Sequence, residues 1–176
     1  MVNPESLLEA ARLQLAAKGR PSSAALRRSV STAYYAMFHL LAGEAAVAMF
    51  ANPDERRRYA PLAFRDFEHN GVRGVVDDLV RPLGQRKAAL REVVPGELGE
   101  ELTRVCKAFS EALKARNTAD YDASKPVKKA AAQAQLALVG NAIDAWATAK
   151  RGDDATRMQM RQVLIALFLY GRTAKR

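Results

Sequence analysis

The sequence predicts an all-α protein, because its composition and its apolar spacing both favour helices. Alanine-rich stretches stand where a β protein would carry Val, Ile and Thr, and apolar residues recur every three or four positions over long segments. The apolar fraction of 49% beside 27% charged residues is ordinary for a globular protein. A chain of 176 residues is near the usual size of one domain and can bury a core without disulfides, so we expect one domain over residues 1–176.

The N-terminal part of the chain carries two helical patterns. The first is expected over residues 4–18, where Gly19 and then Pro21 close it. The second is expected over residues 23–49 and has one broad apolar face. At 100° per residue, four side chains fall within about 60° of one another on the side away from that face. They are Arg28, Thr32, Tyr35 and His39.

The rest of the chain divides at its proline and glycine residues. Residues 52–95 are interrupted by four prolines, so we expect short helices and loops there. A later helix is expected over 96–117, and its apolar stripe, extended by one turn, reaches Arg116. After a loop at 117–126, Pro126 is expected to begin a helix that runs to 151. The last helix, 153–171, is apolar nearly all round and must be covered by this chain or by another copy of it.

Charge and cysteine content limit the partners and the compartment. The net charge of +9 and the pI near 10.0 favour association with nucleic acid or another polyanion. Cys106 is the only cysteine, which excludes an intramolecular disulfide and fits a reducing compartment, so we expect a cytoplasmic protein. The longest wholly apolar run, 163–170, is far shorter than the roughly 20 residues of a membrane-spanning helix, so we expect no membrane partner.

Several enzyme classes lack their sequence patterns here. The chain has no P-loop, no dinucleotide-binding GxGxxG, no HExxH pair and no GxSxG elbow. Its two histidines, His39 and His69, have no neighbours at the spacing of metal ligands. We therefore expect neither a metal nor a cofactor.

Two segments resemble the HEPN superfamily. Arg28-Ser-Val-Ser-Thr-Ala-Tyr-Tyr-Ala-Met-Phe-His39 is similar to the long second helix of HEPN proteins. Arg116-Asn-Thr-Ala-Asp-Tyr-Asp122 is similar to the HEPN signature, in which an Arg and a polar residue come shortly before a His. The resemblance covers about residues 7–149. It implies an up-and-down helical bundle, commonly a homodimer whose signature motifs meet at the interface, with the C-terminal helix as an addition.

The resemblance also implies a chemistry. Active HEPN proteins cut RNA without a metal, since the Arg stabilises charge on the scissile phosphate while the His moves a proton. Arg116 and Asn117 match the first two signature positions, but Tyr121 stands where the His is expected. A phenol with a pKa of about 10 is a poor proton shuttle at neutral pH. The site is therefore expected to bind more readily than to cut.

Three functions follow in order of preference. The first is an HEPN-like dimeric module that binds RNA, a nucleotide or a protein partner such as a nucleotidyltransferase, as the HEPN component of a toxin–antitoxin or defence system. The second is a metal-independent endoribonuclease that uses Arg116. The third is a purely structural helical bundle.

Seven residues form the predicted site. The candidate catalytic residues are Arg116 and His39, and the candidate binding residues are Asn117, Asp120, Tyr121, Tyr35 and Arg28.

Each of these residues also has a structural interpretation. Arg116 could form an ion pair with Asp120 or Asp122, and Asn117 could cap its helix. Tyr121 could pack with its hydroxyl bonded locally. The line through Tyr35 and His39 could be a polar stripe, and His69 is expected to be a turn or cap residue.

Overall fold

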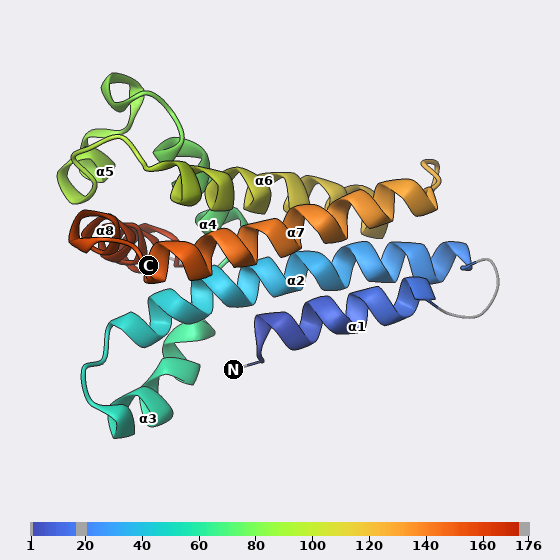
Figure 1. Ribbon diagram of the computed structural model, residues 1–176, viewed down its shortest axis with the longest axis horizontal. Helices are drawn as coiled ribbons and strands as arrows, with labels where there is room; N and C mark the ends of the chain where they lie inside the picture. Colours follow the sequence, from blue (N-terminus) through green and yellow to red (C-terminus); the bar gives the residue numbers. More distant parts are fainter. Residues whose placement is uncertain (1, 17–20, 173–176) are drawn as a thin grey trace.

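The computed structural model of the protein describes residues 2–16 and 21–172, and helices dominate this part of the chain. Four helices run side by side with alternating direction and form an elongated bundle (Figure 1). They are α1 (Pro4–Ala16), α2 (Ser23–Ala48), α6 (Glu100–Tyr121) and α7 (Lys129–Lys150). The other helical segments gather toward one end of the bundle. They are α3 (Pro53–Phe64), α4 (His69–Leu79), the 3-10 turn η1 (Leu83–Gln85), α5 (Ala88–Val93) and α8 (Asp154–Tyr170). The all-α prediction is confirmed.

Side-chain caps fix where several helices begin. Ser22 accepts a hydrogen bond from the backbone N–H of Ala25, and Asp153 accepts one from Thr156, so α2 and α8 begin where the sequence predicts. Asn52 caps α3, with Pro53 as the first helical residue. The predicted end of the first helix, residues 17 and 18, and the closing Gly19 lie outside the described residues.

Helix α2 occupies the centre of the core and contacts α1, α3, α6, α7 and α8. Its large inward side chains include Tyr34, Met37 and Leu41, all fully buried. Small residues Ala42 and Ala46 are also fully buried. A small side chain lets a neighbouring backbone approach closely, so alanines on several sides of α2 allow the other long helices to surround it.

The boundary between α6 and α7 differs from the prediction. Helix α6 continues to Tyr121, so residues 117–121 are helical and Asn117 does not cap the helix end. Helix α7 begins at Lys129, three residues after Pro126. The loop residues alone do not predict the extra turn of α6. The end of this helix is held by Arg27, which is far away in the sequence.

Helix α8 is covered in part by this chain. One face packs against α2, α4, α5 and α7. Its buried residues are Met160, Val163, Leu164, Ala166 and Leu167. Met158, Leu169 and Tyr170 are exposed. Where the chain leaves α8 it passes very close to α4, since a Cβ added at Gly71 would lie 2.7 Å from the backbone oxygen of Gly171.

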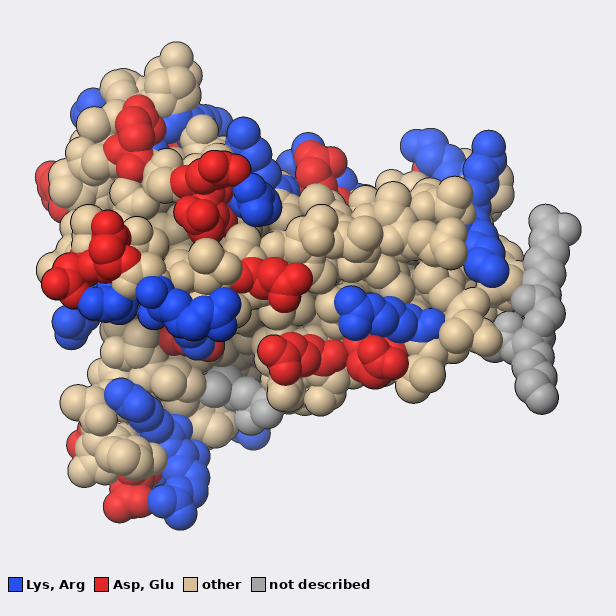
Figure 2. Space-filling view, viewed as in Figure 1, with Lys and Arg blue, Asp and Glu red and all other residues tan. Residues whose placement is uncertain are grey.

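Charged side chains of both signs alternate over the face shown in Figure 2, and one blue cluster covers α3 at the lower left. That cluster fits the exposed run Arg56, Arg57 and Arg58 on α3. Of the helices in the described part of the chain, none has both the length and the hydropathy to cross a membrane.

Candidate functional site

Arg116 lies in the last two turns of α6 and is the centre of the predicted site. Its Nε is 2.7 Å from Oδ2 of Asp120, one turn further along, which makes an ion pair although the N–H does not point at that oxygen. Nη1 donates to Oδ1 of Asn117 at 3.1 Å, and Nη2 donates to the hydroxyl of Tyr35 at 3.5 Å. The Arg116 side chain is 14% exposed. The structure thus brings together five of the seven predicted site residues. They are Arg116 and, around it, Tyr35, Asn117, Asp120 and Tyr121.

Two tyrosine rings flank the guanidinium. Its Cζ lies 4.9 Å from the ring centroid of Tyr121 and 6.0 Å from that of Tyr35. Burial works to lower the pKa of Arg116, but its interactions with Tyr121, Tyr35 and Asp120 outweigh burial and raise that pKa above the usual value. Arg116 is therefore a permanent cation. Tyr121 is itself 72% exposed, so its ring covers Arg116 from the solvent side rather than packing in the core.

Asp120 joins α6 to α2. The hydroxyl of Ser31, on α2, is hydrogen-bonded to Oδ1 of Asp120, while Oδ2 faces Arg116. Both carboxylate oxygens therefore have partners. This arrangement makes Asp120 a residue that positions Arg116 rather than one that is available to a ligand.

Arg27 is a structural element of the site that the sequence did not reveal. Its guanidinium donates to backbone oxygens around the end of α6, at 2.6 Å to Ala119, 3.2 Å to Asp122 and 2.7 Å to Lys125. The last carbonyls of a helix have no partners within the helix and carry partial negative charge, so a cation there is favourable. Arg27 holds the turn that carries Asp120 and Tyr121.

His69 is the second feature that sequence reasoning missed. It is the first residue of α4, as a cap position would suggest, but its ring enters the bundle. Its Nδ1 is 2.5 Å from the hydroxyl of Tyr34, and its ring centroid is 4.2 Å from that of Phe38 and 5.9 Å from that of Tyr35. Burial lowers the pKa of His69, and the positive charge of Arg116 lowers it further. Arg116 and His69 are thus neighbours, although 47 positions separate 69 from 116 in the sequence.

The two remaining predicted residues lie apart from these contacts. His39 follows Tyr35 by one turn of α2, and its ring stacks on Phe64 at 4.8 Å between centroids. Arg28 is exposed on α2, next to Arg27. The structure therefore places His69 against Tyr35, which also contacts Arg116, and it places the ring of His39 against α3.

Neither a metal cluster nor a reactive thiol appears in the described part of the chain. No group of three or more His, Cys, Asp or Glu side chains there could hold a metal ion. Cys106 is buried in α6, and burial raises the pKa of its thiol to about 12. The thiol is protonated at neutral pH and is a poor nucleophile.

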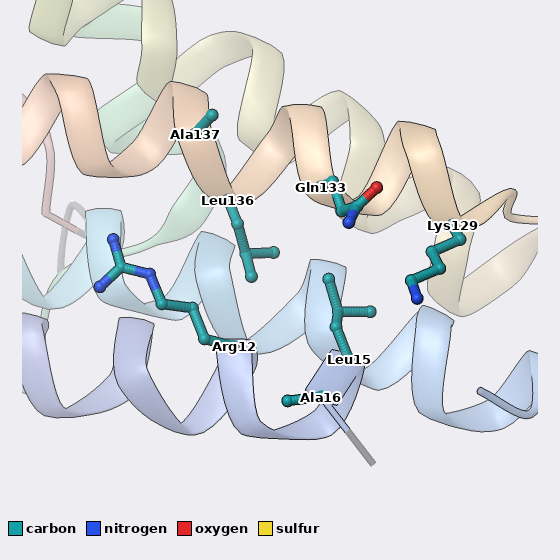
Figure 3. A pocket seen from close by; sticks show the side chains of 7 residues that line it. All are labelled: Arg12, Leu15, Ala16, Lys129, Gln133, Leu136 and Ala137. Atoms are coloured by element: carbon teal, nitrogen blue, oxygen red, sulfur yellow. The ribbon is translucent and has the colours of Figure 1, made fainter. Parts of the chain in front are cut away.

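A separate groove of about 520 Å³ runs between α1 and α7. Figure 3 shows Arg12 of α1 and Lys129 of α7 on either side of Leu15 and Leu136. Ala16, Gln133 and Ala137 complete the lining. None of the seven predicted site residues lines this groove.

The two histidines predict how stability depends on pH. Burial is the main cause that lowers the pKa of both His39 and His69 below 6.5, so the unfolded chain binds more protons than the folded one below that pH. Their contribution to stability is complete above pH 6.5 and is lost as pH falls through the lower folded pKa values. We expect the melting temperature to be constant from about pH 8 to 7 and to fall as the pH drops below about 6.5, where the free energy of unfolding decreases by at most about 1.4 kcal/mol per pH unit for each histidine.

The control for this effect is the double variant His39→Gln, His69→Gln, whose melting temperature should depend much less on pH in the same window. The carboxylates with lowered pKa, Asp122 and Asp153, titrate below 3.8 and do not contribute there. A double variant with the same pH dependence as the wild type would contradict the prediction.

Comparisons of the chain with protein-family models, with curated proteins and with solved structures found no match. The HEPN resemblance remains a prediction from the two segments quoted above.

Proposed function

We propose that the chain is an HEPN-like dimeric module that binds RNA, with Arg116 as the residue that contacts phosphate. The observation that carries the proposal is the way Arg116 is held. The five N–H groups of its guanidinium outnumber its hydrogen bonds to Asn117, Tyr35 and Tyr121, so the side chain is fixed and still has donors left. A fixed cation with unused donors suits a phosphate oxygen.

The exposed ring of Tyr121 adds a feature that favours RNA over a simple anion. Single-stranded RNA is bound by cations that contact its backbone together with aromatic rings on which its bases stack. Tyr121 is 72% exposed and lies 4.9 Å from the guanidinium carbon of Arg116. The net charge of +9 favours any polyanion and adds affinity without sequence preference.

The dimer is the part of the proposal that rests on the resemblance. In HEPN proteins the signature segments of two copies meet, and here the corresponding segment ends α6 with the exposed Tyr121. A second copy at this end would bring two Arg116 side chains to one RNA strand. Light scattering of the purified chain measures its mass directly, and a monomer at every concentration would contradict this part.

Binding assays with matched arginine variants test the central claim. Arg116→Ala should weaken binding of a fluorescent single-stranded RNA about tenfold and reduce the salt dependence by about one phosphate contact. Arg104→Ala is the control, because Arg104 is on the same helix, about 18 Å along its axis, in an exposed pair with Glu100. It removes the same charge and should change affinity less than about twofold.

Two results would overturn the proposal. One is a wild-type chain that does not bind RNA, and the other is an equal loss of affinity in both arginine variants. The same samples test the second function, a metal-independent endoribonuclease, in which Arg116 as a fixed cation would stabilise charge on the scissile phosphate. If RNA incubated with the wild type is shortened and RNA incubated with Arg116→Ala is intact, the chain is a nuclease.

A further inference from the structure

We infer that His69 is a second ligand-binding residue of the Arg116 site, fixed by Tyr34 as the neutral tautomer with its proton on Nε2, and that it donates a hydrogen bond to a phosphate oxygen. The inference rests on the proposed RNA binding and deepens it. It assigns a role to a residue outside both HEPN-like segments.

The tautomer follows from the surroundings of Tyr34. Its side chain is fully buried, and burial raises the pKa of its hydroxyl, so the phenol keeps its proton. In the described part of the structure that hydroxyl has one hydrogen-bond partner, Nδ1 of His69 at 2.5 Å. The phenol must therefore donate and Nδ1 must accept. A neutral imidazole that accepts at Nδ1 carries its hydrogen on Nε2.

Tyr35 is a shared neighbour of His69 and Arg116, and the charge of Arg116 acts on the His69 ring. The ring centroid of Tyr35 is 5.9 Å from that of His69, and its hydroxyl is 3.5 Å from Nη2 of Arg116. Nε2 of His69 has no hydrogen-bond partner among the described residues. Its solvent-accessible area also keeps it out of the set of fully buried, unpaired polar atoms. Nε2 is therefore not fully buried, and its N–H has no partner among the described residues.

The same contacts keep His69 from acting as a proton shuttle. Protonation would add a hydrogen to Nδ1, so the hydroxyl of Tyr34 would lose its acceptor inside the core. It would also place a second positive charge near Arg116. His69 is thus built to donate one hydrogen bond in a constant protonation state, which suits a binding site better than acid–base catalysis.

Nitrogen NMR of the histidine-labelled full chain tests the tautomer without any ligand. At about pH 7.5 the long-range proton–nitrogen spectrum should show His69 with a protonated Nε2 and an unprotonated Nδ1. His39→Gln identifies the signals by leaving His69 alone. If the proton is on Nδ1, or if both nitrogens are protonated, the inference is wrong.

Variants test the contact with the ligand, using a short 2′-O-methyl RNA that cannot be cleaved through its 2′ oxygen. The double variant Tyr34→Phe, His69→Phe removes both hydrogen-bond partners together and so leaves no buried hydroxyl unpaired. We expect it to bind this RNA about tenfold more weakly than the wild type. His69→Gln retains an acceptor and a donor and should recover part of the affinity.

The outcomes separate the two claims. If the double variant is folded by circular dichroism and binds as tightly as the wild type while Arg116→Ala binds weakly, His69 is not a ligand residue and the proposed RNA binding stands. If the wild type does not bind the RNA, the proposed function fails, and with it the role of His69 toward phosphate.

Discussion

Replacing Arg86 by Met should lower the free energy of unfolding by about 3 kcal/mol. The Arg86 side chain is 1% exposed, although Arg86 lies in the irregular segment between α4 and α6. It donates to the backbone oxygens of Arg81 at 3.0 Å and Gly96 at 2.7 Å, and to Oε2 of Glu97 at 2.7 Å. Met has a similar length and no donors, so these acceptors would lose their partner. Urea unfolding of both proteins measures the difference.

Arg91→Met is the matched control, because Arg91 lies on α5 in the same segment and is exposed. Surface substitutions of this kind usually change stability by less than about 0.5 kcal/mol. Equal stability of the two variants would show that the buried contacts of Arg86 do not hold the segment. A smaller denaturant slope for Arg86→Met would instead indicate that the segment unfolds separately from the bundle.

Arg86 also shows what a sequence can and cannot predict in this fold. The long helices were predictable because apolar spacing, capping residues and proline positions are local, and α2 and α8 follow the predicted bounds within one residue. The sequence around Arg86 has no feature that distinguishes it from an exposed basic residue. Its burial depends on the backbone oxygen of Gly96 and the carboxylate of Glu97, ten and eleven positions away, which only the folded chain brings to its side chain.

The candidate site also contains some residues that the sequence predicts and others that only the structure reveals. Tyr35 and four residues of the α6 segment were predictable, since Asn117, Asp120 and Tyr121 follow Arg116 within two turns of one helix. His69 was expected to be a turn or cap residue, and only its packing against α2 reveals the bond to Tyr34. Helical spacing and the resemblance of its segment to an HEPN helix made His39 the candidate beside Arg116, but spacing along one helix does not say which neighbouring helix a side chain meets.

Replacing Arg27 by Met should loosen the end of α6 and weaken RNA binding, because Arg27 connects this end to α2. Its guanidinium donates to the carbonyls of Ala119, Asp122 and Lys125, and removing a charged donor from several partly buried acceptors should destabilise the chain by about 2 kcal/mol. The affected turn carries Asp120, which orients Arg116. Amide hydrogen exchange should therefore become faster near the end of α6 while the α2 core stays protected.

Two further substitutions decide whether the end of α6 is held by the planar geometry of the Arg27 guanidinium or only by its positive charge. Arg28→Met removes the same charge from the adjacent exposed position and should leave exchange at the end of α6 unchanged. Arg27→Lys keeps the charge, but an ammonium lacks the planar fork that reaches several carbonyls at once, so it should restore only part of the protection. If Arg27→Lys behaves like the wild type, the positive charge near the helix end is sufficient. Intermediate protection would mean that the fork itself holds the turn on which Arg116 depends.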